Sequence, residues 1–83
     1  MAARTHAARV RESIRVGSVT LAEALADEAN RSMRVGRMLR AVPGIGRAKS
    51  TAILEAAGVD ESRRVRGLGP RQRETILKHV GGR

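Results

Sequence analysis

Residues 41–50 read AVPGIGRAKS, and this short stretch lies between two helix-like segments. Proline cannot continue a helix, so PGIG at 43–46 forms a turn between two helical segments. Glycine has no Cβ, which lets the backbone approach a ligand, while Ile45 can turn inward and anchor the turn. The first amides of the next helix lack internal partners and carry the positive end of its dipole. The turn is therefore either a plain helix connection or a cradle for phosphate.

A second turn, GLGP at 67–70, repeats the pattern of glycine, aliphatic residue and glycine. It also precedes a basic segment, and it follows the arginine-rich run SRRVR at 62–66. Clustered bases beside outward-facing amides are typical of phosphate binding, although a charge run is also often only a solvated face. The candidate backbone-binding residues of the two turns are Pro43, Gly44, Ile45, Gly46, Arg47, Lys49, Arg63, Arg64, Arg66, Gly67, Gly69, Arg71 and Arg73.

The predicted fold class is all-α, because apolar residues recur at helical spacing and no segment alternates as a strand would. Thr20 and Glu23 form a capping-box pattern that starts a helix, and Gly58 is suited to end one in a left-handed cap. Proline at position 70 fits the first turn of the last helix. The expected helices cover residues 2–15, 20–30, 31–42, 47–57 and 70–80.

The apolar spacing also predicts which side chains form the core. Before the first glycine turn, the expected interior residues are Val35, Met38, Leu39 and Val42. After it they are Ile45, Ala48, Ala52, Ile53 and Ala56. Ile76, Leu77 and Val80 point inward from the last helix, and Leu68 anchors the second turn.

Length and composition limit both the architecture and the function. With 83 residues we expect a basic N-terminal helix or arm at 1–17 and a single helical nucleic-acid-binding domain at 18–83. A net charge of +9 indicates a polyanionic partner. The chain has no aromatic residue, which argues against modules that stack unpaired bases and leaves duplex backbone binding.

Several other classes find no support in the sequence. The chain has no cysteine and only two histidines, so we expect no metal site and no cofactor. We identify no nucleophile, base or acid at catalytic spacing, and hence predict no enzymatic activity. No apolar stretch has the length of a signal peptide or membrane span, so we expect a cytoplasmic protein without a membrane partner.

The N-terminal segment carries a candidate second contact. Arg4, Arg11 and Arg15 fall on one face of the expected first helix. They either contact the DNA backbone or keep the segment soluble.

The segment VPGIGRAKSTAILEAAGVDESRRVRGLGPRQRETIL resembles the helix-two-turn-helix module of a ribosomal protein in the head of the bacterial small subunit. Its first part also resembles the helix-hairpin-helix motif of nonspecific duplex-binding proteins. The combination of MLRAVPGIGRAKS with ESRRVRGLGPRQRETILKHV is similar to the actinobacterial integration host factor family, over roughly residues 20–80. The N-terminal region departs most from that family, since it is shorter than expected.

The resemblance implies a monomeric nucleoid-associated protein that binds duplex DNA with little sequence preference, bends it, and assists phage integration together with an integrase. It also implies that the PGIG turn contacts the DNA backbone through Gly44, Ile45, Gly46, Arg47 and Lys49. Two alternatives remain open on the residues alone. One is an RNA-binding, ribosome-associated protein, and the other is a protein-interaction adaptor whose interface includes Leu21, Leu25 and Met38.

Overall fold

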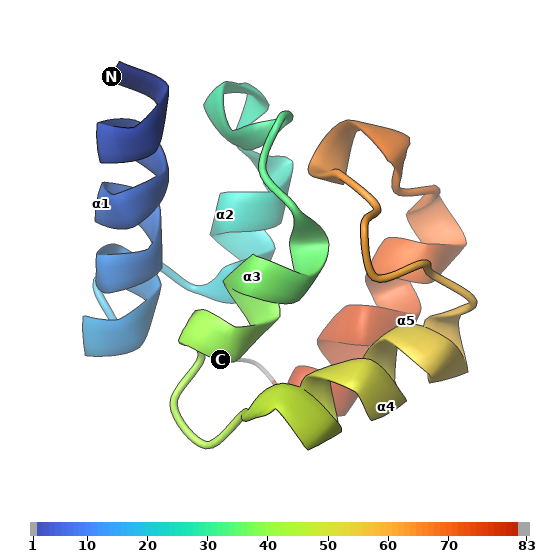
Figure 1. Cartoon of the computed structure of the whole chain (residues 1–83). Coiled ribbons are helices and arrows are strands. Elements are labelled where there is room, and N and C mark those ends of the chain that lie inside the picture. Colours follow the sequence, from blue (N-terminus) through green and yellow to red (C-terminus); the bar gives the residue numbers. More distant parts are fainter. Residues whose placement is uncertain (1, 82–83) are drawn as a thin grey trace.

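The computed structural model describes the backbone of residues 2–81 and the side chains of residues 6–81 (Figure 1). Within that range every regular element is helical, apart from one isolated antiparallel bridge between Arg34 and Arg64. The all-α prediction is confirmed. The elements in chain order are α1 (Ala2–Val16), α2 (Leu21–Ala26), the 3-10 turn η1 (Glu28–Asn30), α3 (Val35–Ala41), α4 (Arg47–Ala57), the 3-10 turn η2 (Val65–Gly67) and α5 (Pro70–Val80).

Helix α1 packs on the rest of the chain along α3 and α2. It ends before Gly17, whose φ of 84° is in the left-handed region that favours glycine. Ile14 is buried in the common core, and Val10 packs beside it. A hydrogen bond of 2.7 Å joins His6 Nε2 to the side-chain oxygen of the buried Asn30. These contacts hold α1 as one wall of the molecule.

Helix α2 begins as its capping box predicts. Thr20 Oγ1 accepts a hydrogen bond from the Glu23 amide, and the Glu23 carboxylate accepts one from the Thr20 amide. The helix is shorter than predicted, because Asp27 takes an extended conformation and its carboxylate accepts from the Ala29 amide instead. Residues 28–30 therefore form η1 and do not continue the α-helix.

The third predicted helix also starts later than expected, at Val35 rather than at residue 31. Residues 31–35 run alongside residues 63–66, and three backbone hydrogen bonds of 2.9–3.0 Å join the two segments. Their donors are the amides of Val35, Val65 and Arg66, and their acceptors are the carbonyls of Arg63, Met33 and Arg31. Because these groups are paired across the molecule, residues 31–34 do not extend α3 toward its N-terminus.

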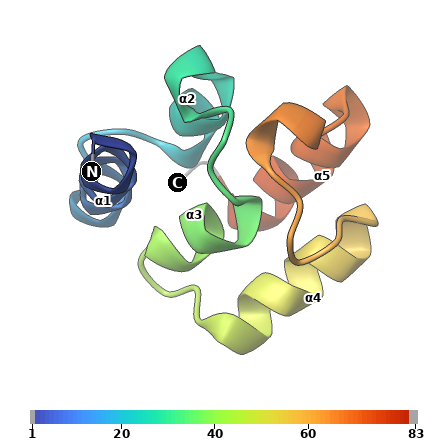
Figure 2. The ribbon, with the colours of Figure 1, turned by 45° about the horizontal axis from the view of Figure 1, so that its top comes forward.

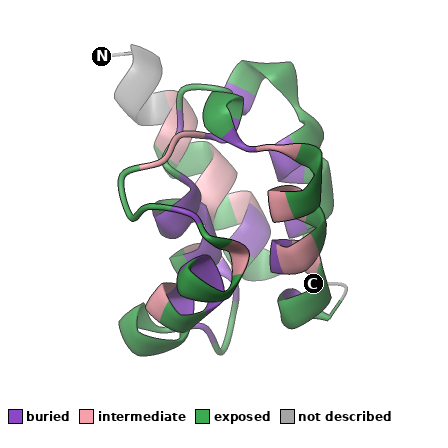
Figure 3. Ribbon diagram, turned by 90° about the vertical axis from the view of Figure 1, so that its right-hand side faces the viewer, coloured by how far each residue is buried: buried purple, intermediate pink, exposed green. Residues whose placement is uncertain are grey.

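The core contains the apolar residues expected before the first glycine turn, all four of them buried: Val35, Met38, Leu39 and Val42. Leu21 and Leu25 are buried as well, so the surface proposed for a protein-interaction adaptor does not exist. Among the residues with described side chains, Val16 is the only large hydrophobic one that is exposed. Figure 3 shows that the buried residues face the middle of the molecule while the outer sides of the helices are exposed.

Helix α4 presents a different face to the core from the one predicted. Ala48, Ala52 and Ala56 are exposed, and the buried residues are Ser50, Ile53 and Leu54. Ile53 belongs to both faces, and burying the large side chain of Leu54 beside it stabilises the fold more than burying alanine methyl groups. The prediction for Ile45 and Ile53 is confirmed, and so is the left-handed cap at Gly58, with φ of 68°.

Candidate nucleic-acid interface

The PGIG turn joins α3 to α4 in the geometry that its glycines predict. Gly44 has φ of 89°, a conformation that a residue with a side chain adopts only at a cost. Ile45 is buried, and its amide donates to the carbonyl of Val42 at 3.0 Å. The turn is thus anchored from inside, while Pro43, Gly44 and Gly46 remain on the surface.

The start of α4 lies open. Gly46 is its N-cap, no side chain caps the helix, and a Cβ built on Gly46 would meet nothing within 4 Å. The first amides of the helix have no acceptor within it and point outward, as at any helix start. Arg47 and Lys49 are both exposed beside them. The arrangement combines outward amides, the positive end of a helix dipole and two cations.

The GLGP turn also has a buried aliphatic residue between its glycines, but the N-terminus of the helix that follows is different. Leu68 is buried, as predicted, and Gly69 is the N-cap of α5. The Gly69 amide already donates to the side chain of Gln72 at 3.0 Å, and Gln72 in turn donates to the carbonyl of Gly58 at 3.2 Å. Pro70, the first helical residue, has no amide hydrogen to offer. Fewer backbone donors are therefore available here than at α4.

The arginines around the second turn are partly engaged in the fold. Arg63 donates to the carbonyl of Gly67 at 2.9 Å, and Arg64 donates to the carbonyl of Ser32 at 2.6 Å. A Cβ on Gly67 would lie 2.8 Å from Cδ of Arg63, so the absent side chain makes room for that arginine. Arg66 and Arg71 are exposed.

The fold does not bring the two glycine turns together. In Figures 1 and 2 the turn before α4 lies near the lower edge of the molecule, while η2 and the start of α5 lie toward the upper right. The predicted residues therefore form two separate surfaces. Surface one is the PGIG turn with the start of α4, and surface two is the GLGP turn with η2 and the start of α5.

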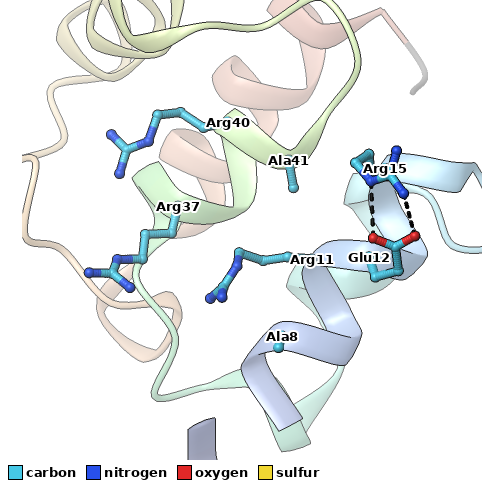
Figure 4. Close-up of a pocket in the computed structure, with 7 residues that line it drawn as sticks. All are labelled: Ala8, Arg11, Glu12, Arg15, Arg37, Arg40 and Ala41. Atoms are coloured by element: carbon cyan, nitrogen blue, oxygen red, sulfur yellow. Dashed lines mark hydrogen bonds and ion pairs between the residues drawn. The ribbon is translucent and has the colours of Figure 1, made fainter. Parts of the chain in front are cut away.

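A groove between α1 and α3 contains two of the three N-terminal arginines. Arg11 and Arg15 line it from α1, whereas the side chain of Arg4 lies outside the described residues. Arg37 and Arg40 line it from α3, and the sequence analysis missed both of them (Figure 4). The groove has a volume of about 560 Å³. The spacing of three residues between Arg37 and Arg40 was the available signal, since it places both on one helical face.

Among the residues with described side chains, Glu12 is the only acidic one that lines this groove. Its carboxylate accepts a hydrogen bond of 3.0 Å from Nε of Arg15 and a second one from the same guanidinium. These hydrogen bonds, supported by the opposite charge of Arg15, lower the pKa of Glu12 below its usual value. Glu12 is therefore ionised at neutral pH and neutralises Arg15.

Other kinds of site find no counterpart in the described part of the chain. Among residues 2–81 there is no cluster of three histidine, cysteine, aspartate or glutamate side chains suited to a metal ion. None of the described helices combines the length and the apolarity needed to cross a membrane.

A basic helical protein with two glycine turns, each at the start of a helix, has the architecture of a helix-two-turn-helix module. The profile of the S13-like H2TH domain family matches residues 8–80. The chain is 33% identical over 84 residues to the integration host factor of Mycobacterium tuberculosis, covering 96% of this chain and 80% of that relative. It is 32% identical to the integration host factor of Streptomyces coelicolor, over 96% of this chain and 78% of that protein.

A solved structure agrees with these relatives. The structure of sIHF bound to an 8bp palindromic DNA superposes with a TM-score of 0.87 at 32% identity, covering 96% of this chain and 94% of the other. The chain belongs to the integration host factor family of actinobacteria, within the S13-like H2TH domain family. The resemblance found in the sequence is confirmed.

Proposed function

We propose that this protein is an architectural protein that binds duplex DNA through the phosphate backbone, with little sequence preference, and bends or compacts it. The observation that carries the proposal is the open start of α4 behind the PGIG turn. There, the first turn of a helix without a side-chain cap carries exposed Arg47 and Lys49, and Gly46 leaves open space for a phosphate. Outward amides and a positive dipole end are the features that bind phosphate at helix starts.

The comparisons support the same ligand. The structural neighbour with a TM-score of 0.87 was solved with DNA bound to it. The absence of aromatic residues from the whole sequence makes base stacking a poor source of affinity, so counterion release at phosphates supplies most of the binding.

The remaining parts of the proposal concern how the protein works in the cell. It acts as a non-enzymatic monomer in the cytoplasm, on the nucleoid, and assists a phage integrase by shaping the DNA. Equilibrium sedimentation of the purified protein tests the monomer. A stable dimer in the absence of DNA contradicts it.

A gel-shift titration at several salt concentrations tests the backbone mechanism. If about five to eight phosphates are neutralised, log K plotted against log salt has a slope of about −4.5 to −7. Unrelated duplex sequences of equal length should bind within about threefold of one another, because phosphate contacts do not depend on the base sequence. An affinity that does not change with salt contradicts the mechanism.

If surfaces one and two contact the same duplex, the duplex must bend. The two surfaces lie on different parts of the molecule, and DNA has to curve to reach both. Ligase-catalysed circularisation of fragments shorter than the persistence length of about 150 base pairs measures this. The protein should increase the yield of circles. If the yield of circles does not increase at saturating protein, the protein binds DNA without bending it.

RNA binding is the second candidate function, and the family description favours it, since the module is named after a ribosomal protein. Competition separates the two functions. Labelled duplex DNA bound to the protein is challenged with unlabelled duplex DNA or with a structured RNA of equal length. We expect the DNA to be the better competitor. More effective competition by the RNA would favour the ribosome-associated function.

A further inference from the structure

We propose that the groove between α1 and α3 is a further phosphate-binding site, which extends the contact with the duplex that docks on the PGIG turn. The proposal rests on the DNA-binding function proposed above and adds a site with its own residues, Arg11, Arg37 and Arg40. The ligand is the sugar-phosphate backbone of duplex DNA.

The first argument is charge. Four guanidinium groups line the groove against a single carboxylate, that of Glu12, which is paired with Arg15. The side chains of Arg11, Arg37 and Arg40 make no hydrogen bond or ion pair with any described residue. Three unpaired positive charges gathered in one concavity repel one another and attract a polyanion.

The second argument is geometry. In Figure 4, Arg11 extends from α1 toward α3, Arg37 and Arg40 extend in the same direction from α3, away from α1, and Arg15 and Glu12 lie together at the right of the view. The small side chains Ala8 and Ala41 also line the groove, so a bulky backbone can approach closely. Arg37 and Arg40 are three residues apart and therefore lie on one face of α3.

The third argument is continuity with surface one. Arg15 lines both the groove and a neighbouring hollow that reaches Val42 and Pro43. Ala41, the last residue of α3 before the PGIG turn, also lines the groove. A strand seated on the turn can therefore run on into the groove without leaving the protein surface.

Glu61, an acidic residue on the other side of α3, explains why the DNA strand would follow the α1 side. Glu61 and Ser62 line a separate hollow there with Arg34, Arg37 and Arg40. The Glu61 carboxylate accepts a hydrogen bond from Thr51 at 2.9 Å. Its negative charge opposes a phosphate on that side, whereas the carboxylate on the α1 side is neutralised by Arg15.

The test is the double variant Arg37→Ala with Arg40→Ala, measured on a 30-base-pair duplex over a range of salt. Loss of two phosphate contacts should reduce the salt slope by about 1.8, at about 0.9 for each contact. The matched control is Arg9→Ala with Lys78→Ala, which removes the same charge from exposed positions outside the groove and both turns. The variant Arg37→Lys with Arg40→Lys retains the charge and should keep the slope of the wild type.

A slope and affinity equal to those of the control variant would overturn the proposal, provided that circular dichroism shows equal helicity. A wild-type protein that binds no duplex at all would instead overturn the proposed function itself. The two failures are therefore distinguishable.

A second measurement uses the absence of cysteine from the sequence. Arg37→Cys provides a unique attachment point for an iron chelate that cleaves nearby DNA, and Lys49→Cys provides one at surface one. Both labels should cut the bound duplex at sites a few base pairs apart. Cutting from the Lys49 position alone would place the groove away from DNA and overturn the proposal.

Discussion

The two glycine turns have the same sequence pattern but differ in what their helix starts leave available. At the PGIG turn the helix is uncapped and Gly46 has open space around it. At the GLGP turn the side chain of Gln72 occupies the Gly69 amide, and Pro70 removes another donor. A glycine turn therefore does not by itself define a phosphate site, because the residues that follow it decide how many amides remain free.

The largest effect is expected at the N-cap of α4. Gly46→Asp and Gly46→Asn differ only in charge, and both cap the helix well. A carboxylate at the phosphate position repels the DNA, so Asp should weaken duplex binding at least about tenfold more than Asn at low salt. Gel shifts of the two variants measure the difference. Equal affinities of the two variants would indicate that the principal DNA contact lies at surface two.

Gly44 and Gly69 provide a matched pair for stability. Gly44 has φ of 89°, so Gly44→Ala is strained and should cost about 1–2 kcal/mol. Gly69 has φ of −77°, and its added Cβ would come no closer than 3.6 Å to Gln72. Gly69→Ala should therefore change stability by only about 0.5 kcal/mol. Thermal unfolding monitored by circular dichroism checks both values. Equal losses contradict the distinction.

Gln72→Ala tests whether the hydrogen bond from the Gly69 amide to the Gln72 side chain makes this amide unavailable to DNA. The variant loses the hydrogen bonds to Gly69 and Gly58, which should cost about 1 kcal/mol of unfolding free energy. Because it frees the Gly69 amide, DNA affinity should stay the same or rise slightly. Chemical denaturation and gel shifts give the two values. A marked loss of affinity in the folded variant would mean that Gln72 itself binds the ligand.

The smallest effect concerns pH. The Asp60 carboxylate accepts from the amide and the hydroxyl of Ser62, and these hydrogen bonds lower the pKa of Asp60. A lowered pKa means that its contribution to stability is present above the ordinary aspartate pKa of about 3.9 and is lost as the pH falls through the lower folded value.

The comparison variant is Asp60→Asn, which lacks this titration. Its difference in melting temperature from the wild type should shrink between about pH 5 and pH 2. The loop before surface two thus contributes less to stability at acidic pH. The PGIG turn contains no carboxylate, so no such loss is expected there. A difference that is constant over this range would contradict the role of Asp60.

Local chemistry was enough to predict the fold class, both turns and several helix ends. The capping box of Thr20 and the left-handed cap at Gly58 depend on near neighbours in sequence, and both are confirmed. The late start of α3 was missed because it depends on pairing between residues about thirty positions apart. Periodicity does not reveal such pairing.

The face of α4 and the basic groove were missed for a related reason. Two faces of α4 had apolar residues at helical spacing, and only the neighbouring helices determine that Leu54 is buried and Ala52 is exposed. Arg37 and Arg40 were left out because their partner wall, α1, meets α3 only in the folded molecule. Candidate residues next to a recognisable motif were therefore predicted more completely than those brought together by packing.

The pairing of residues 31–35 with 63–66 holds the two halves of the molecule in a defined relative position. Each of its three backbone hydrogen bonds links the segment before the first turn to the segment before the second. These backbone hydrogen bonds, together with the one from the Arg64 side chain to the Ser32 carbonyl, restrain how far the two turns can move relative to each other. Duplex DNA that contacts both turns must therefore bend to fit the separation that the fold sets between them.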